Sequence, residues 1–205
     1  RVASRGLGDV YKRQHNNLGN FLKNLGKSEA AESSFRKAIL LKPEFTEAYN
    51  NLGNLLNDLG RLDEAEASYR KAIKINQNYA EAHSNLGAVL KDLGKLDEAE
   101  ASCKKAVLLE PDYDEARYNL GLCLFYSNQY EQALKQFEKI DIGLSNSYAI
   151  RCSFLKDEQS VFFKRLDTLI KGGEANAVIG SIINSSEIKY GIKKTNTLCN
   201  EQLQI

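Results

Sequence analysis

The stretch TEAYNNLGNLLNDLGRLDEAEASYRKAIKINQNY, residues 46–79, decides the fold because the chain repeats it. Residues 80–113 follow at once as AEAHSNLGAVLKDLGKLDEAEASCKKAVLLEPDY and are identical to it at 19 of 34 positions. The same core returns upstream as NNLGN at 16–20 and downstream as YNLGL at 118–122, again 34 residues away. A fixed period of this length is typical of repeat proteins, in which each unit is one small supersecondary structure. The frame gives four units, at residues 12–45, 46–79, 80–113 and 114–147.

Each unit is predicted to hold two helices joined by a short turn. In the unit at 46–79 the apolar side chains fall on two helical stripes, the first at Ala48, Leu52, Leu55 and Leu56 and the second at Ala65, Tyr69, Ala72 and Ile73. Between the stripes stands Gly60, which suits the positive φ that ends many helices. The corresponding positions of the other units are Gly26, Gly94 and Asn128, all residues that tolerate this conformation.

A second glycine stands in the middle of each first helix, where it costs about 1 kcal/mol relative to Ala. We expect it to let the two helices of a unit approach closely, with a large side chain such as Tyr69 filling the space between successive units. The third unit has Cys103 at the position of that aromatic residue, which predicts a looser contact there.

These features resemble the tetratricopeptide repeat (TPR) family, whose 34-residue unit is a helix–turn–helix. The Leu-Gly pair, the central Ala, the aromatic residue, the second Ala and the terminal Pro (Pro43 and Pro111) occur in register over about two thirds of the chain. Departures are Gln77 in place of Pro and Ile140 in place of the second Ala. The resemblance implies an all-α fold, a right-handed α-solenoid of four units whose first helices line the concave side.

The two ends of the chain read differently from the repeats. Residues 1–14 carry four basic residues and one acid without clear periodicity, and are interpreted as a non-native leader preceding a TPR array at 15–145. Residues 146–189 show two apolar stripes and are expected to form helices that cap the array, because a solenoid must cover its last face. Residues 190–205 are a polar tail or the start of a missing domain. The absence of Met favours a fragment of a longer protein.

Composition excludes several classes of function. The formal net charge is +1, so the whole chain gives no electrostatic reason to bind nucleic acid or an anionic membrane. With 4 Cys in no CxxC pair and only 2 His, metal ligands are scarce, no cofactor is expected, and a reducing, cytoplasmic location is the simplest interpretation. No apolar run is long enough to cross a bilayer.

Four asparagines occupy one position of the four units and form the asparagine ladder: Asn17, Asn51, Asn85 and Asn119. An amide side chain can donate to a peptide carbonyl and accept from a peptide N–H at once, so a row of amides suits an extended backbone of any sequence. The arrangement is similar to the asparagine ladder in the TPR region of the O-linked N-acetylglucosamine transferases. The alternative is that these amides bond a neighbouring helix and belong only to the repeat consensus.

Further residues widen the candidate surface. The polar strip beside the ladder includes Asn20, Asn50 and Asn54, and the fourth unit adds an aromatic face around Tyr118. That aromatic face either holds an apolar ligand side chain or is covered by a helix at 147–156. Glu47, Glu81 and Glu115 at the lip favour neutral or basic ligands.

No catalytic site is predicted. A TPR subtype that grips C-terminal carboxylates needs Lys and Arg where this chain has Asn16, Glu81 and Asn85. His15 and His83 are two repeats apart in one packing position, and no GxSxG, HExxH or Walker motif occurs.

The hypothesis is therefore a non-catalytic module that binds an extended protein or peptide segment through the asparagine ladder. The alternative is a substrate-recruiting arm of a truncated bacterial multidomain enzyme, such as an iron(II)/2-oxoglutarate oxygenase, a glycosyltransferase or a sulfotransferase. Scaffolding by self-association is a third hypothesis.

Overall fold

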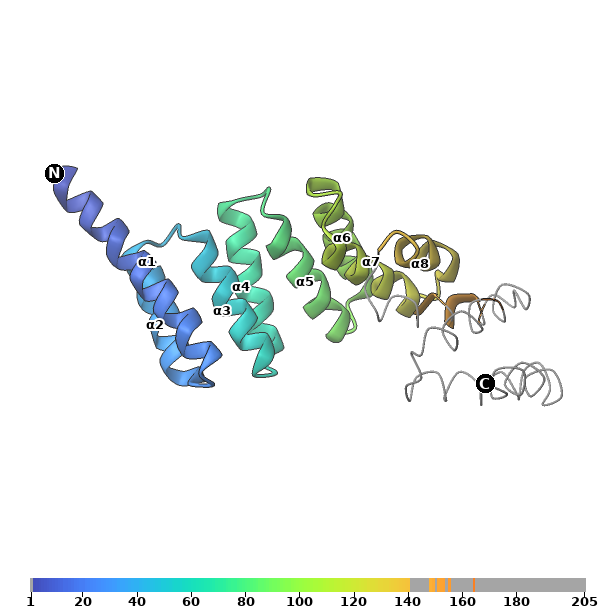
Figure 1. Ribbon diagram of the computed structural model, residues 1–205, viewed down its shortest axis with the longest axis horizontal. Coiled ribbons are helices and arrows are strands. Elements are labelled where there is room, and N and C mark those ends of the chain that lie inside the picture. The colour runs from blue at the N-terminus through green and yellow to red at the C-terminus, as the bar shows by residue number, and fades with distance from the viewer. Residues whose placement is uncertain (1, 141–147, 150, 154, 156–163, 165–205) are drawn as a thin grey trace, which may run out of the picture. The chain divides into compact units, whose positions relative to one another are not determined.

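The fold is seen in a computed structural model, which describes residues 2–140, 148–149, 151–153, 155 and 164 (Figure 1). Among these residues there is no strand. The helices are α1 (Val2–Asn24), α2 (Ser28–Leu41), α3 (Thr46–Asp58), α4 (Leu62–Ile75), α5 (Ala80–Asp92), α6 (Leu96–Leu109), α7 (Asp114–Tyr126) and α8 (Tyr130–Phe137). The predicted all-α fold is confirmed.

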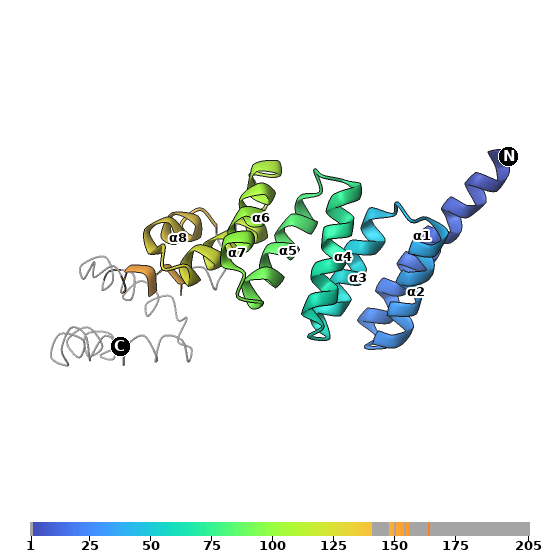
Figure 2. The same cartoon turned by 180° about the vertical axis from the view of Figure 1, so that it is seen from behind.

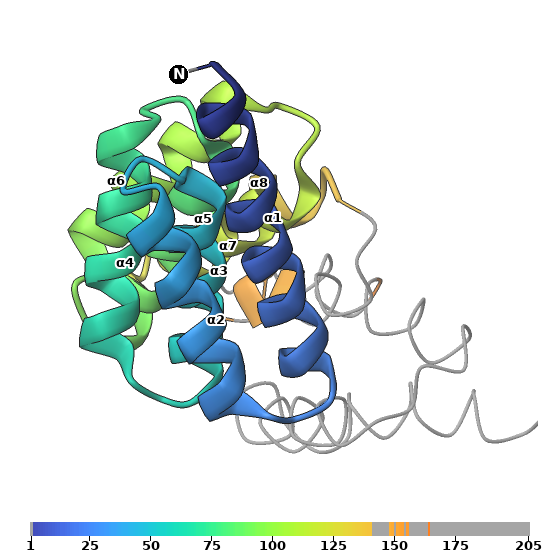
Figure 3. The same ribbon diagram turned by 90° about the vertical axis from the view of Figure 1, so that its left-hand side faces the viewer.

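The chain divides into two compact units, Arg1–Asn119 and Leu120–Ile205. In the first unit, α1 packs on α2, α3 on α4 and α5 on α6, so that each repeat is a helical hairpin. Successive hairpins meet through α2 with α3 and α4 with α5, and the first helices also touch one another, α1 with α3 and α3 with α5. The order of the hairpins of the first unit is visible from both sides (Figures 1 and 2), and the end-on view shows α4 and α6 on one side of α3 and α5 (Figure 3).

The turns within the hairpins follow the sequence closely. Gly26, Gly60, Gly94 and Asn128 all have positive φ, between 61° and 76°. At Gly60 the amide donates to the carbonyl of Asn57, and the amide of Arg61 donates to that of Leu56, both at 2.9 Å. This pair of bonds satisfies carbonyls at the end of α3 that have no partner within the helix. The predicted role of these residues is confirmed.

The mid-helix glycines are explained by side chains of their own repeats. A Cβ built on Gly53 would lie 2.6 Å from Cε1 of Tyr69, and one on Gly19 would lie 2.5 Å from Cε1 of Phe35. The aromatic ring therefore lies directly on the glycine backbone, and Tyr69 is only 1% exposed. Within the second unit, Phe137 meets Gly121 in the same way.

Within the third repeat the contact at Cys103 is close. A Cβ on Gly87 would overlap Sγ of Cys103 and would also lie 3.1 Å from the carbonyl oxygen of Ala99 in the backbone of α6. Cys103 is fully buried. The smaller side chain therefore leaves no gap beside Gly87, as close-packed interiors require.

The first helix is longer than the sequence predicted. Residues 2–14 show no clear periodicity, yet α1 runs through them and projects beyond α2 (Figure 1). Once a helix is nucleated, each added residue gains a hydrogen bond, so it can extend beyond its packed segment. Lys12 is buried, with its ammonium 5.4 Å from the centre of the ring of Phe45, the residue before α3, which holds this part of α1 against the end of its own repeat. The capping helices predicted at 146–189 and the tail at 190–205 lie almost entirely outside the described residues.

Candidate functional site

The asparagine ladder lies on the first helices of the four repeats, with Asn17 on α1, Asn51 on α3, Asn85 on α5 and Asn119 on α7. Asn17 is exposed and the other three are partly buried. Each of those three uses its Nδ2 to bond a residue 35 positions earlier, on the first helix of the preceding repeat. Asn51 donates to Oδ1 of Asn16 at 3.0 Å, Asn85 to Oδ1 of Asn50 at 3.1 Å, and Asn119 to Oγ of Ser84 at 3.0 Å.

These bonds connect neighbouring repeats. Bonding to a neighbouring helix is the alternative to ligand binding that the sequence left open for these amides. Asn85 also donates to Oδ1 of Asn54 at 3.0 Å. Within the described part of the chain, the Oδ1 atoms of Asn51, Asn85 and Asn119 accept no hydrogen bond. Asn85 therefore uses both of its amide hydrogens inside the protein, Asn51 and Asn119 use one each, and all three keep the acceptor Oδ1 available.

The other predicted polar residues separate into buried and accessible ones. Asn50 is fully buried and donates to Oε1 of Glu81 at 2.8 Å, so its side chain holds α3 to α5 and does not reach the surface. Asn54 is partly buried and accepts from the hydroxyl of Tyr69 at 2.7 Å. Asn20, on α1, is partly buried and is not among the residues that line the pocket described next.

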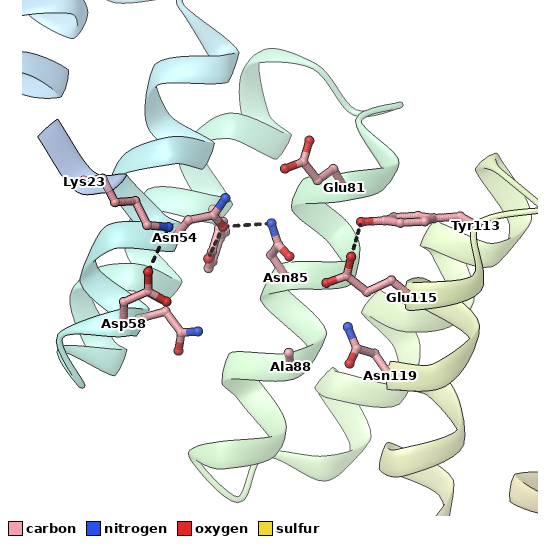
Figure 4. A pocket seen from close by; sticks show the side chains of 11 residues that line it. Lys23, Asn54, Asp58, Glu81, Asn85, Ala88, Tyr113, Glu115 and Asn119 are labelled. Carbon is pink, nitrogen blue, oxygen red and sulfur yellow. Dashed lines mark hydrogen bonds and ion pairs between the residues drawn. The ribbon is translucent and has the colours of Figure 1, made fainter. Parts of the chain in front are cut away.

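A polar pocket of about 350 Å³ lies beside the ladder in the first unit (Figure 4). It is lined by Lys23 of α1, by Asn54, Asn57 and Asp58 of α3, by Tyr69 of α4, by Glu81, Asn85 and Ala88 of α5, by Tyr113, and by Glu115 and Asn119 of α7. Two ladder residues, Asn85 and Asn119, thus line one pocket. Asn17 and Asn51 do not.

The charges in this pocket are unbalanced. Lys23 pairs with Asp58 at 2.8 Å between Nζ and Oδ2. Glu81 and Glu115 have no cationic partner among the described residues. Burial, together with the negative charges of Asp58, Glu81 and Glu115, raises the pKa of Tyr69 well above its usual value. Burial and the nearby carboxylates of Glu115 and Glu81 raise the pKa of Tyr113 in the same way. The carboxylates therefore give the pocket a negative potential.

Sequence reasoning placed the two glutamates at the lip but missed Lys23, Asp58, Tyr69 and Tyr113 as pocket residues. Tyr69 was identified only as a core side chain, because helical periodicity does not show that its hydroxyl reaches Asn54. Lys23 and Asp58 are 35 positions apart, the same offset as the ladder bonds, and that shared offset is the signal that could have paired them.

The aromatic face of the fourth repeat lies partly in the second unit. Phe125 packs edge-on against Tyr148 with ring centres 5.3 Å apart, and Phe137 stacks on Tyr148 at 5.5 Å. Tyr148 falls within the segment 147–156 that the sequence proposed as a cover for this face. Tyr118 belongs to the first unit, lies on α7 and is partly buried.

The two histidines are both partly buried on first helices, His15 on α1 and His83 on α5. His83 is partly buried on α5 and its Nε2 lies 3.1 Å from the carbonyl oxygen of Gln77. Burial lowers the pKa of His83, the bond to Gln77 opposes that effect, and the charge of Lys105 adds to it. No helix within the described residues is long and apolar enough to span a membrane.

Comparison with known proteins identifies the repeats. Models of the TPR repeat match residues 53–94, and models of the tetratricopeptide repeat match residues 15–45, 34–67 and 78–140, so that together they span 15–140. No curated protein matches the chain significantly.

Several solved structures are similar to this one. YrrB, described as a TPR protein with an unusual peptide-binding site, is 24% identical over 80% of this chain and 88% of its own, with a TM-score of 0.69. PilF of Pseudomonas aeruginosa is 21% identical over 93% of this chain and 90% of its own, with a TM-score of 0.76.

The first TPR of Spaghetti (RPAP3), bound to the HSP90 peptide SRMEEVD, is 24% identical over 58% of this chain and 94% of its own, with a TM-score of 0.56. At these identities the similarity concerns the fold. The repeat frame, the hairpins and the matching family models agree, and the chain belongs to the tetratricopeptide repeat family.

Proposed function

We propose that this chain is a non-catalytic protein-interaction module that binds an extended segment of a partner protein. The observation that carries the proposal is the polar pocket on the first helices, where side-chain amides with unused Oδ1 atoms lie in a preformed hollow of about 350 Å³. Two of the similar TPR structures are described with a peptide or a peptide-binding site, which supports the same use of the fold.

In this proposal the asparagine ladder contacts the ligand mainly through its side-chain oxygen atoms. Nδ2 of Asn51, Asn85 and Asn119 already donates to the preceding repeat, so a ligand meets these residues mainly through Oδ1. Their Oδ1 atoms can receive peptide N–H groups, each bond contributing about 0.5–1.5 kcal/mol net. Nearby, Nδ2 of Asn54 and of Asn57 donates to no described residue and can bond a peptide carbonyl. A few such bonds, less the ordering of the ligand, give a Kd on the order of micromolar.

The test is binding of fluorescently labelled nonapeptide pools to the full chain, measured by anisotropy. We expect saturable binding, and we expect the double variant Asn51→Ala with Asn85→Ala to weaken it by about tenfold, as the loss of one to two hydrogen bonds predicts. Gln132→Ala, an exposed amide on α8 that does not line the pocket, is the matched control.

Thermal unfolding of each variant separates a loss of binding from a loss of fold, because Asn85 also joins two repeats. Binding by a correctly folded double variant that equals that of the parent would contradict the ladder. An absence of binding by every pool to the parent chain would contradict the proposed function itself.

A further inference from the structure

The polar pocket has a hydrogen-bonding balance that points to one kind of ligand group. On its α5 and α7 side, most of the protein's own donors are already used. Nδ2 of Asn85 makes two bonds to the preceding repeat, Nδ2 of Asn119 makes one, and the hydroxyl of Tyr113 lies 3.4 Å from Oε2 of Glu115 as a donor. What remains on that side is mainly a set of oxygen acceptors, beside one N–H of Asn119. A ligand group that matches it must carry several donors.

The charges lead to the same conclusion by a separate route. Lys23, a cation that lines the pocket, is paired with Asp58. Glu81 and Glu115 extend from neighbouring helices toward the same hollow (Figure 4). Neither has a cationic partner among the described residues, so the charged residues that are described around the pocket leave an excess of negative charge.

A structural role explains part of this arrangement. Glu81 and Glu115 stand in the first turns of α5 and α7, where acids complement the helix dipole. Glu81 also accepts from Asn50 at 2.8 Å and from the hydroxyl of Tyr79 at 3.0 Å. Glu47 occupies the same position of the second repeat, in the first turn of α3, but does not line the pocket. The helix dipole therefore explains why all three repeats have an acid at this position. It does not explain why two of the three acids, Glu81 and Glu115, line one pocket.

We propose that the pocket between Glu81 and Glu115 receives the side chain of an arginine or lysine of the bound segment. A guanidinium presents five N–H donors and no acceptor, which matches two carboxylates and the amide oxygens of Asn85 and Asn119. The α3 side, where Nδ2 of Asn54 and Asn57 has no partner among the described residues, accepts a main-chain carbonyl of the same segment. This inference rests on the proposed function and defines the chemistry of the partner.

The experiment compares nonapeptide pools that differ only in a fixed central residue: arginine, lysine, citrulline or glutamate, with the other positions degenerate and both ends blocked. Citrulline has nearly the shape of arginine without its charge, so it isolates the electrostatic contribution. We expect the arginine pool to bind the full chain at least about tenfold more tightly than the citrulline pool, since hydrogen bonds between charged partners are about twice as strong as neutral ones. The preference should decrease as salt is added.

The double variant Glu81→Gln with Glu115→Gln tests the residues directly. It should remove the preference for arginine over citrulline, measured as the ratio of the two Kd values for the same variant. Glu47→Gln is the matched control, because it changes the same repeat position by the same charge outside the pocket, and it should keep the preference.

The outcomes separate this inference from the proposed function. If all pools bind with equal affinity, or if the glutamate pool binds best, the cation site is wrong while the peptide-binding function stands. If Glu47→Gln removes the preference as fully as the pocket variant does, the preference arises from general surface charge and the site is again wrong. If no pool binds, the proposed function fails first.

Discussion

The second and third repeats, residues 46–79 and 80–113, are alike in sequence but join their helices in different ways. In the second repeat the ring of Tyr69 lies on Gly53, and its hydroxyl donates to Asn54 at 2.7 Å. In the third repeat Cys103 takes the place of the ring, and a Cβ on Gly87 would approach the backbone of α6. Both side chains are buried. The same 34-residue frame thus fills the space beside its glycine either with an aromatic ring or with a cysteine next to the backbone of the second helix, and neither repeat has a gap there.

The largest expected effect comes from removing the ring. Tyr69→Ala should lower the free energy of unfolding by about 3–5 kcal/mol, because a large buried side chain leaves a cavity between two helices. Cys103→Ala, which removes one atom from the equivalent site, should lower it by about 1 kcal/mol. Urea unfolding followed by circular dichroism gives both values, and equal losses would show that the two repeats pack alike.

Cys103→Tyr is the next test. A close contact and a loose contact between α5 and α6 predict opposite signs for the change in the free energy of unfolding. If α5 and α6 are in close contact, the ring has no room and stability should fall by about 1–3 kcal/mol, as in other overpacked cores. A looser contact, which the sequence alone suggested, would instead let the ring fill the space and raise stability. Tyr69→Phe is the control for the contribution of the hydroxyl.

The contacts between these two repeats can be tested through Glu66, which accepts from Lys95 of the third repeat and Arg70 of its own, both at 2.8 Å. These partners, Lys95 above all, lower the pKa of Glu66 below 4.5. A carboxylate with a lowered pKa stabilises the fold above that value, and the contribution is lost as pH falls through the folded pKa.

We therefore expect Glu66→Gln to cost up to about 1 kcal/mol at neutral pH and nearly nothing in strong acid. Unfolding by urea at several pH values measures the difference. The comparison variant is Glu29→Gln, which removes an exposed acid on α2 that has no ion-pair partner among the described residues. A loss for Glu66→Gln that stays constant with pH would contradict the ion pair as its cause.

The smallest effect concerns His83 of the third repeat, whose counterpart in the second repeat is Tyr49. Because burial lowers the pKa of His83 below 6.5, the unfolded chain binds a proton more readily than the folded one. Stability should therefore decrease as pH falls below about 6.5, by less than about 1 kcal/mol. His83→Tyr should remove this decrease in a series of thermal unfolding measurements, and an unchanged pH profile would contradict it.

Most of the fold could be predicted because its signals are local. The positive φ at Gly60 and Gly94 and the apolar stripes of α3 and α4 depend on residues within one or two turns of each other. A period of 34 residues repeats those signals, so an error in one unit is corrected by the others. The helix over residues 2–14 escaped prediction because it carries no such pattern.

The candidate site was predicted only in part. The shared position of Asn85 and Asn119 identified two of the pocket residues, and the offset of 34 placed Glu81 and Glu115 on one side. The sequence could not say that Asn85 would bond Asn50 and Asn54, since those partners stand 35 and 31 positions away. It also could not say that Asn50, one position before a ladder residue, would be fully buried.

The sequence by itself therefore determined the repeat, its helices, its turns and the family, because each of these is written in short-range patterns that recur. Only the tertiary structure decided which amide atoms are used between repeats, how near α5 comes to α6 at Cys103, and that Glu81 and Glu115 line one pocket while Glu47 does not. The physical reason is that hydrogen-bond partners and close packing depend on distances between helices, and those distances are fixed by all the contacting side chains together.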